Sequence, residues 1–181
     1  VAALTPAPSL TLAGATAKDN VKLSASAAAG GSTNVNALLI VGSGNTISGG
    51  PINVMSGLVL NAGGSNTVSA PLNFGGQTAV VATPNLNQNL TASGVVSGDL
   101  GITKFGPGAL NLTGNNSYAG TTTIFEGTLR ISHSNALGAA AGSNATQGTI
   151  VQNGAALEID GSAGAVNVGE EALTLSGLGF G

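Results

Sequence analysis

Residues 38–53 read LLIVGSGNTISGGPIN and residues 58–73 read LVLNAGGSNTVSAPLN, so the chain repeats a pattern of its own at short range. Leu38 aligns with Leu58, and the Asn-Thr pair inside each segment aligns at an offset that is longer by a single position. The difference falls in a glycine-rich stretch, where a loop accepts an insertion at little cost. A recurrence of about 20 residues, built from short apolar runs and turns, predicts one coil of a β-solenoid per repeat.

Short runs in which apolar and polar residues alternate occur along the whole chain, and each ends at Gly, Asn or Ser. This pattern is typical of strands with one buried face. Two Ala-rich stretches, 24–31 and 136–143, are interrupted by glycine and are expected to be loops. At about 20 residues per coil and roughly 4.8 Å per coil, the chain predicts about nine coils and a rod of about 40–45 Å. The predicted strands are 10–14, 21–26, 109–114, 121–125, 128–132, 156–161 and 172–177.

The composition excludes several classes of protein. Charged residues make up 6% of the 181 residues and the net charge is −3, but Leu, Ile, Val and Phe supply 46 residues, enough apolar surface for a core rather than a disordered chain. Four basic residues cannot neutralise a nucleic-acid backbone, so no nucleic-acid partner is expected. Polar residues interrupt every apolar run, which argues against a membrane-spanning helix. The absence of cysteine excludes disulfides and thiolate metal sites.

Residues 94–131 carry the most ordered motif of the chain, GVVSGDLGITKFGPGALNLTGNNSYAGTTTIFEGTLRI. This stretch resembles the autotransporter-associated β-strand repeat, also called the passenger-associated transport repeat. Residues 134–142 and 148–161 resemble its continuation, whereas residues 1–93 share the alternating runs and turn residues but lack the motif. The repeat positions are Gly106, Gly108, Leu110, Leu112, Gly114, Asn116, Tyr118, Gly120, Thr122, Ile124, Gly127 and Leu129.

The resemblance implies an all-β fold, a right-handed parallel β-helix of the passenger type. Residues 1–181 would form a single solenoid array, with divergent coils over 1–93 and passenger-repeat-like coils over 94–181. It also implies a secreted or cell-surface location outside the outer membrane, and a stalk, scaffold or adhesin function. From the residues themselves, glycines are expected at the coil corners, and Leu110, Leu112 and Ile124 are expected to point inward.

Candidate catalytic groups are few. His133 is the one histidine of the chain and is expected to be an exposed loop residue, because a metal or catalytic site needs partners. A pair of carboxylates could serve glycoside hydrolysis, but solvated turn and edge positions are the more plausible assignment. Tyr118 could stack on a sugar, although capping a coil corner is the favoured interpretation. We therefore expect no catalytic, cofactor or metal site, after weighing the acids Asp99, Glu126, Glu158, Asp160, Glu170 and Glu171.

Two alternatives to a purely structural role stay open. The first is a β-helix that binds or cleaves carbohydrate, with surface glycans or a host receptor as partners. The second is a subunit of an extracellular filament, because the alternating pattern continues uncapped to the last residues, "LTLSGLGFG", and the start, "VAALTPAPSLTLAG", is equally uncapped. That start also lacks the basic and apolar regions of an intact signal peptide and is expected to be a processed or excised beginning. We expect the last coil to pack either on further coils of a longer chain or end to end on a second copy.

Overall fold

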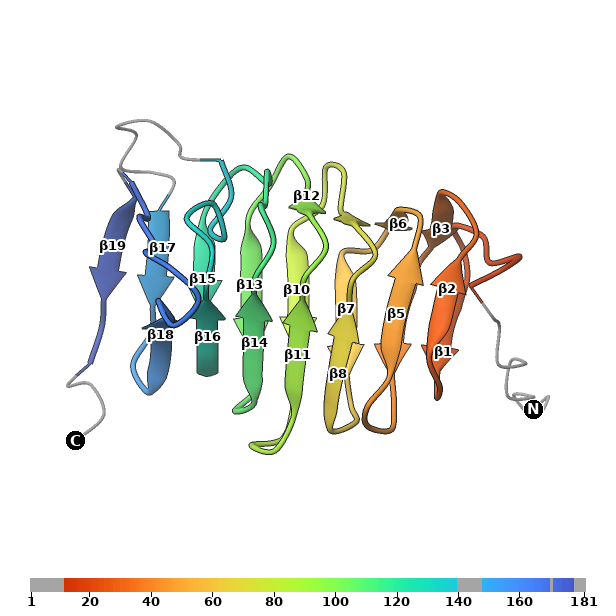
Figure 1. Ribbon diagram of the computed structural model, residues 1–181, viewed down its shortest axis with the longest axis horizontal. Helices are drawn as coiled ribbons and strands as arrows, with labels where there is room; N and C mark the ends of the chain where they lie inside the picture. Colours follow the sequence, from red (N-terminus) through yellow and green to blue (C-terminus); the bar gives the residue numbers. More distant parts are fainter. Residues whose placement is uncertain (1–11, 140–147, 170, 178–181) are drawn as a thin grey trace, which may run out of the picture.

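The computed structural model describes residues 12–139, 148–169 and 171–177, and these residues form an all-β parallel solenoid (Figure 1). The chain winds through successive coils whose strands stack side by side along the long axis, with the N-terminal coils at one end and the C-terminal coils at the other. Every pairing between described strands is parallel. The described part contains no helix, and hence none that could cross a membrane.

Three sheets form the walls of the solenoid. Sheet A has eight strands, in the order β1 (Asn20–Leu23), β4 (Ala37–Ile40), β7 (Leu58–Asn61), β10 (Ala79–Ala82), β13 (Ile102–Phe105), β15 (Thr122–Ile124), β17 (Gly148–Val151) and β19 (Ala172–Leu175). Sheet B has seven, β2 (Ala27–Ala29), β5 (Thr46–Gly49), β8 (Ser65–Val68), β11 (Asn89–Ala92), β14 (Ala109–Leu112), β16 (Gly127–Ile131) and β18 (Ala155–Ile159). Sheet C has four, β3 (Thr33–Val35), β6 (Ile52–Val54), β9 (Leu72–Asn73) and β12 (Val96–Ser97).

The solenoid has about seven turns over the described residues, so the expectation of about nine was too high. Some coils are longer than assumed: the chain segment between the paired residues Ile124 and Val151 is longer than the segment between the paired residues Lys104 and Ile124. Seven turns at roughly 4.8 Å each give a rod of about 34 Å. The coil length varies because the corners between strands absorb extra residues, while the strands keep their pairing.

The pairing also corrects the alignment of the opening repeat. Leu38 pairs with Val59 rather than with Leu58. Leu38 and Val59 are both fully buried, whereas Leu58 lies on the outside of sheet A. Because successive side chains of a strand point to opposite faces, a slip of one residue would exchange the buried and exposed positions. In sheet A the true offset is therefore the longer one, which the Asn-Thr pairs show.

Most predicted strands coincide with observed ones, but two predictions were wrong. The expected strand over 10–14 is not formed at residues 12–14, which make a turn. The Ala-rich stretch over 24–31, expected to be a loop, contains strand β2, whose Ala27 pairs with Ile47 of β5. Alanine has little intrinsic preference for strands, and here the neighbouring coil supplies the ladder that holds it. Of the second predicted loop, 136–143, residues 136–139 are described and form no strand.

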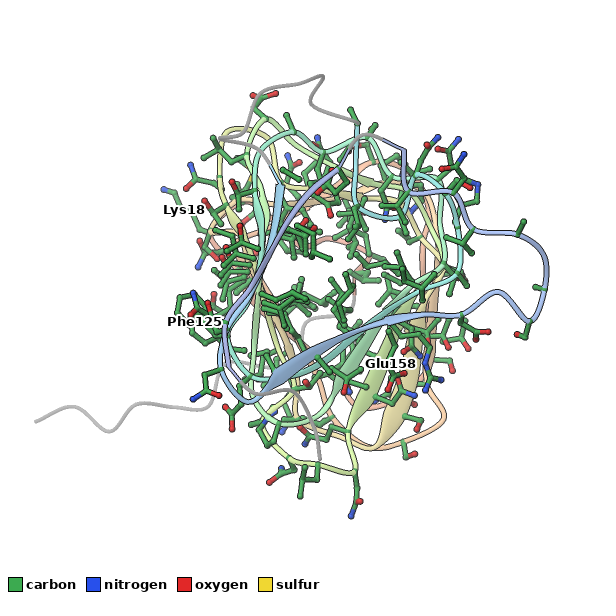
Figure 2. All side chains as sticks on the ribbon, turned by 90° about the vertical axis from the view of Figure 1, so that its left-hand side faces the viewer. Lys18, Phe125 and Glu158 are labelled. Atoms are coloured by element: carbon green, nitrogen blue, oxygen red, sulfur yellow. The ribbon has the colours of Figure 1, made fainter. Side chains whose placement is uncertain are left out.

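The core consists of columns of side chains that meet the same position in the next coil. Figure 2, a view along the solenoid, shows side chains directed inward from the walls. In sheet A one column runs Val21, Leu38, Val59, Val81, Lys104, Ile124, Val151 and Leu175. In sheet B the matching column runs Ala27, Ile47, Val68, Ala92, Leu112, Ile131 and Ile159.

Both columns reach the C-terminal rung and become exposed there. Leu175 is 69% exposed, although its neighbour in the column, Val151, is buried. Ile159 is 58% exposed, although its neighbour Ile131 is fully buried. Within the described residues, the inward face of this last rung is thus an apolar surface.

Candidate functional site

The predicted repeat positions come together in two adjacent coils formed by β13 to β16. Among the apolar positions, Leu110, Leu112, Ile124 and Leu129 are all fully buried. Leu110 pairs with Leu129 across the two coils. The alternation of apolar and polar residues along β14 therefore matches the two faces of sheet B, with Asn111 on the outside.

The repeat glycines lie at the corners and at points where neighbouring coils approach each other. Gly127 begins β16 with a φ of +70°, and a Cβ there would collide with the backbone of Gly106 and Gly108 in the preceding coil. Both reasons favour glycine at this position, because L-residues rarely adopt positive φ. The other repeat glycines, whose added Cβ atoms would also meet backbone atoms of adjacent coils, are Gly106, Gly108, Gly114 and Gly120.

Lys104 is a fully buried cation within the apolar column of sheet A. Its Nζ donates hydrogen bonds to the carbonyl oxygens of Phe105 (3.0 Å), Gly106 (2.6 Å) and Glu126 (3.2 Å). Burial lowers the pKa of the Lys104 ammonium to about 8, and the charge of Glu126 opposes this shift. The side chain therefore joins two successive corners through their carbonyl groups.

After β12, the last strand of sheet C, the side chain of Asn116 supplies hydrogen bonds between coils that a further strand would otherwise make. Its Oδ1 accepts a hydrogen bond from the backbone N–H of Val96 (2.8 Å), and its Nδ2 donates to the carbonyl oxygen of Ala136 (2.7 Å). The side chain is 3% exposed. A single amide thus bonds to the coil before it and to the coil after it, and the buried backbone groups on both sides are satisfied.

Tyr118 is buried and cannot present its ring to a ligand at the surface. Its hydroxyl lies 2.7 Å from Oγ1 of Thr122, another buried repeat position. Burial raises the pKa of Tyr118 well above its ordinary value, and the hydrogen bond with Thr122 opposes the shift. The ring fills the interior beside the corner, where Gly138 lies close to it.

Several of the acids considered above as catalytic candidates, and the histidine, make only local contacts in the described structure. Glu158 forms an exposed ion pair with Arg130 (2.7 Å) on the outside of sheet B (Figure 2), and the Asp160 carboxylate accepts from the N–H of Ser162 (3.0 Å). His133 is half-buried, and its Nδ1 accepts from the N–H of Asn135 (3.0 Å).

Glu171 lies near the exposed last rung. It accepts a hydrogen bond from the hydroxyl of Thr149 (3.0 Å), and burial raises the pKa of its carboxyl.

The remaining candidate acids do not form a site. Asp99 and Glu126 are exposed, and Glu170 lies outside the described residues. No group of three or more metal-ligating side chains occurs within the part of the chain that the structure describes.

A ladder of asparagines on the outer face of sheet C was not predicted as a site. Asn34, Asn53 and Asn73 occupy the same register position in three successive coils. Asn53 Nδ2 donates to Asn34 Oδ1 (2.7 Å), and Asn73 Nδ2 donates to Asn53 Oδ1 (3.0 Å). The three asparagines line a groove of about 380 Å³ together with Val54, Met55 and residues 74–77. The signal in the sequence was an asparagine that recurs once per coil.

Two stacked aromatic rings form a second outward feature. Phe105 and Phe125 follow the inward residues Lys104 and Ile124 of adjacent coils, and their ring centroids lie 4.8 Å apart at 9°. Each ring is nearly half exposed, and Phe125 points away from the solenoid in Figure 2. The pair lies next in sequence to the corner carbonyl groups of Gly106 and Glu126, to which the Lys104 amine donates.

Comparison with known proteins agrees with the motif. The family model of the passenger-associated transport repeat matches residues 102–131, which run from the start of β13 to the end of β16. A segment of 75 residues is 43% identical to the adhesin BmaC autotransporter of Brucella suis biovar 1 (strain 1330). That match covers 39% of this chain and 2% of the adhesin, so the chain corresponds to a small part of that relative. No solved structure matches the chain.

Proposed function

We propose that this chain, which carries a passenger-associated transport repeat at residues 102–131, is a non-catalytic structural segment of an exported passenger. It would lie outside the outer membrane as part of a stalk, scaffold or adhesin. The observation that carries the proposal is that the matched residues make up two adjacent coils of a continuous solenoid, not a separate domain. The similarity to a protein named as an autotransporter adhesin supports the same assignment.

The chemistry of the described residues supports a non-catalytic role. The buried polar groups of the repeat, Lys104, Asn116 and Tyr118, bond to backbone carbonyls, backbone amides and a neighbouring hydroxyl. Such contacts hold coils together and direct these polar atoms at the fold rather than at a substrate. Carbohydrate cleavage is the enzymatic alternative, and polysaccharide turnover that disappears in the Glu158→Ala or Asp160→Ala variant would favour it over the structural role.

The location can be tested in the bacterium that carries the gene. A short epitope inserted at the exposed turn 161–164, where Gly164 N–H donates to Gly161 carbonyl (3.1 Å), should leave the strands intact. Protease added to intact cells should remove the epitope while a periplasmic marker survives. If the epitope is cleaved only after the envelope is opened, the proposed location is wrong.

The apolar last rung favours a second candidate function, end-to-end self-association. Leu173 and Leu175 are more than half exposed at positions where the preceding coil buries Thr149 and Val151. Together with Ile159 they offer the surface on which another coil would pack, either from the same longer chain or from a second copy.

Light scattering of the purified chain over a range of concentrations tests this candidate. Association that Leu175→Lys weakens, and that Leu86→Lys on an exposed loop leaves intact, is the expected result. A monomer at every concentration would contradict self-association. Packing on further coils of one longer chain is the other possibility, and hydrogen exchange measured on the natural gene product would then show protected amides in β19.

A further inference from the structure

The groove beside the asparagine ladder has the dimensions and lining of a ligand site. Its volume of about 380 Å³ lies within the range of about 300–1,000 Å³ that small-molecule sites occupy. One side is formed by the ladder on sheet C, and the other by the turn that follows β9. That turn is fixed by two hydrogen bonds, from the N–H of Gly75 to Asn73 Oδ1 (3.1 Å) and from the N–H of Gln77 to the carbonyl of Phe74 (3.0 Å).

Within the ladder, the side-chain amide of the middle residue, Asn53, is fully hydrogen-bonded, whereas the amides of the two end residues, Asn34 and Asn73, can form further hydrogen bonds. Asn53 donates both amide hydrogens, to Asn34 Oδ1 (2.7 Å) and Ser32 Oγ (3.0 Å), and accepts from Asn73. Within the described residues, Nδ2 of Asn34 donates no hydrogen bond, Nδ2 of Asn73 donates one, and the side-chain amide of Gln77 makes none. The groove therefore offers free amide hydrogen-bonding capacity at Asn34 and Asn73 on the ladder and at Gln77 on the turn.

An apolar surface lies next to these amides. Met55, which follows β6, is 49% exposed and lines the groove, and the buried Val54 and Phe74 form part of its floor. Ligand sites commonly combine an apolar surface of this kind with a few polar groups that fix orientation.

The groove has no charge, and this restricts the ligand. None of its lining residues is Asp, Glu, Lys, Arg or His. An anionic ligand would find no cation among the lining residues to offset the loss of its hydration. A purely apolar ligand would bury the amides without partners, at a cost for each unpaired group. A neutral ligand with many hydroxyl groups would pair the amides and place its C–H face on Met55.

We propose that this groove binds an uncharged glycan chain. The amides of Asn34, Asn73 and Gln77 bond to its hydroxyl groups, and Met55 contacts a sugar face. This inference rests on the proposed adhesin-like function and names a ligand class for it. An extended peptide is the other polymer that could occupy a groove, and it would need an unpaired strand edge. Asn53 and Asn73 lie in β6 and β9, which pair on both sides, and among the described strands that line the groove only β3, which carries Asn34, has an unpaired edge. Most of the groove therefore offers a peptide no edge to extend.

The test uses the purified chain on an array of neutral oligosaccharides built from glucose, galactose, mannose and N-acetylglucosamine, alongside sialylated and sulfated chains and unstructured peptides. Binding to neutral chains is the expected result. The double variant Met55→Ala/Gln77→Ala should reduce the affinity about tenfold or more, because it removes the apolar contact and one amide while the backbone hydrogen bonds of both residues stay in place.

A second variant fills the groove. Gly76 lines it, has no left-handed φ, and has open space where a Cβ would lie, so Gly76→Trp should fold and block binding. The matched control is Gly30→Trp, at an exposed glycine with the same two properties outside the groove lining, and it should bind like the parent.

Three results would overturn the inference: no neutral glycan bound, binding restricted to charged glycans or peptides, or binding that survives Gly76→Trp and the double variant. The surface-protease experiment separates this failure from that of the proposed function. A chain that is exposed on cells but binds no neutral glycan contradicts the groove inference alone.

Discussion

The Nζ atom of Lys104 lies 2.6 Å from the carbonyl oxygen of Gly106, inside a column whose other buried members are Leu, Ile and Val side chains. A lysine at this position of the apolar column holds two successive corners together, because its amine donates hydrogen bonds to carbonyl groups of both. Its cost is the burial of an amine, which lowers the Lys104 pKa to about 8 from an ordinary 10.5.

The lowered pKa predicts that stability rises with pH. Between pH 8 and 10 the unfolded chain keeps the Lys104 proton and the folded chain releases it, so the unfolded state binds more protons and the free energy of unfolding increases. The gain should be on the order of 2 kcal/mol. Urea denaturation at several pH values measures it. Lys104→Met should flatten the rise, and Lys18→Met, at an exposed turn, should not. An equal slope in all three proteins would show that Lys104 does not cause it.

Asn116→Ala should destabilise the chain by about 2–3 kcal/mol, because the N–H of Val96 and the carbonyl of Ala136 lose their side-chain partner inside the solenoid. Hydrogen exchange at the Val96 amide should accelerate as well. The control is Asn115→Ala, an exposed neighbour that accepts a hydrogen bond from Asn135 (2.9 Å) and should cost less than about 0.5 kcal/mol. Unchanged exchange at Val96 in Asn116→Ala would contradict the bridging role.

The single tyrosine of the chain allows an optical test of the interior. Because burial raises the Tyr118 pKa, the folded chain should show no tyrosinate absorbance at a pH where the urea-unfolded chain already shows it, about pH 11. The unfolded state then binds fewer protons, so stability should fall as the pH rises above about 10. Tyr118→Phe should abolish that fall. Free titration of Tyr118 in the folded chain would mean that the ring is accessible.

Gly127→Ala should cost several kcal/mol, since the new Cβ requires a strained φ and collides with the backbone of the preceding coil. The matched change Gly30→Ala meets open space and should be tolerated or slightly stabilising. Thermal unfolding followed by circular dichroism compares them. Similar melting temperatures would show that the coils can move apart at this corner.

The solenoid could be predicted because both of its signals, alternation within strands and recurrence from one coil to the next, are visible in the sequence itself. Leu110, Leu112 and Ile124 could be assigned inward from alternation alone. The strand β2 could not be predicted, because Ala27–Ala29 has no strand signal of its own and forms its ladder with the neighbouring coil. The number of turns was overestimated because corner lengths do not follow the repeat. The ligand groove depends on Asn34, Asn53 and Asn73 facing outward in register, which only the pairing of sheet C establishes.

The inward orientation of the Lys104 side chain could not be predicted from the sequence either. A charged residue in an alternating strand is expected to point outward, and outward and inward positions differ by one residue. In β13 the inward position holds Lys104 and the outward position next to it holds Phe105. The carbonyl groups at the corners reverse the usual preference, because they supply the hydrogen bonds that a buried amine needs.

The unequal steps of sheet A, a short one from Lys104 to Ile124 and a longer one from Ile124 to Val151, have a consequence for how such a protein can be altered. The rise of the solenoid is set by strand pairing, and the amount of chain per coil is set by its corners. A peptide or binding loop added at a corner would therefore project sideways without lengthening the rod or shifting the side chains of later coils out of line. The solenoid could display inserted segments at regular heights, each about one strand spacing above the last.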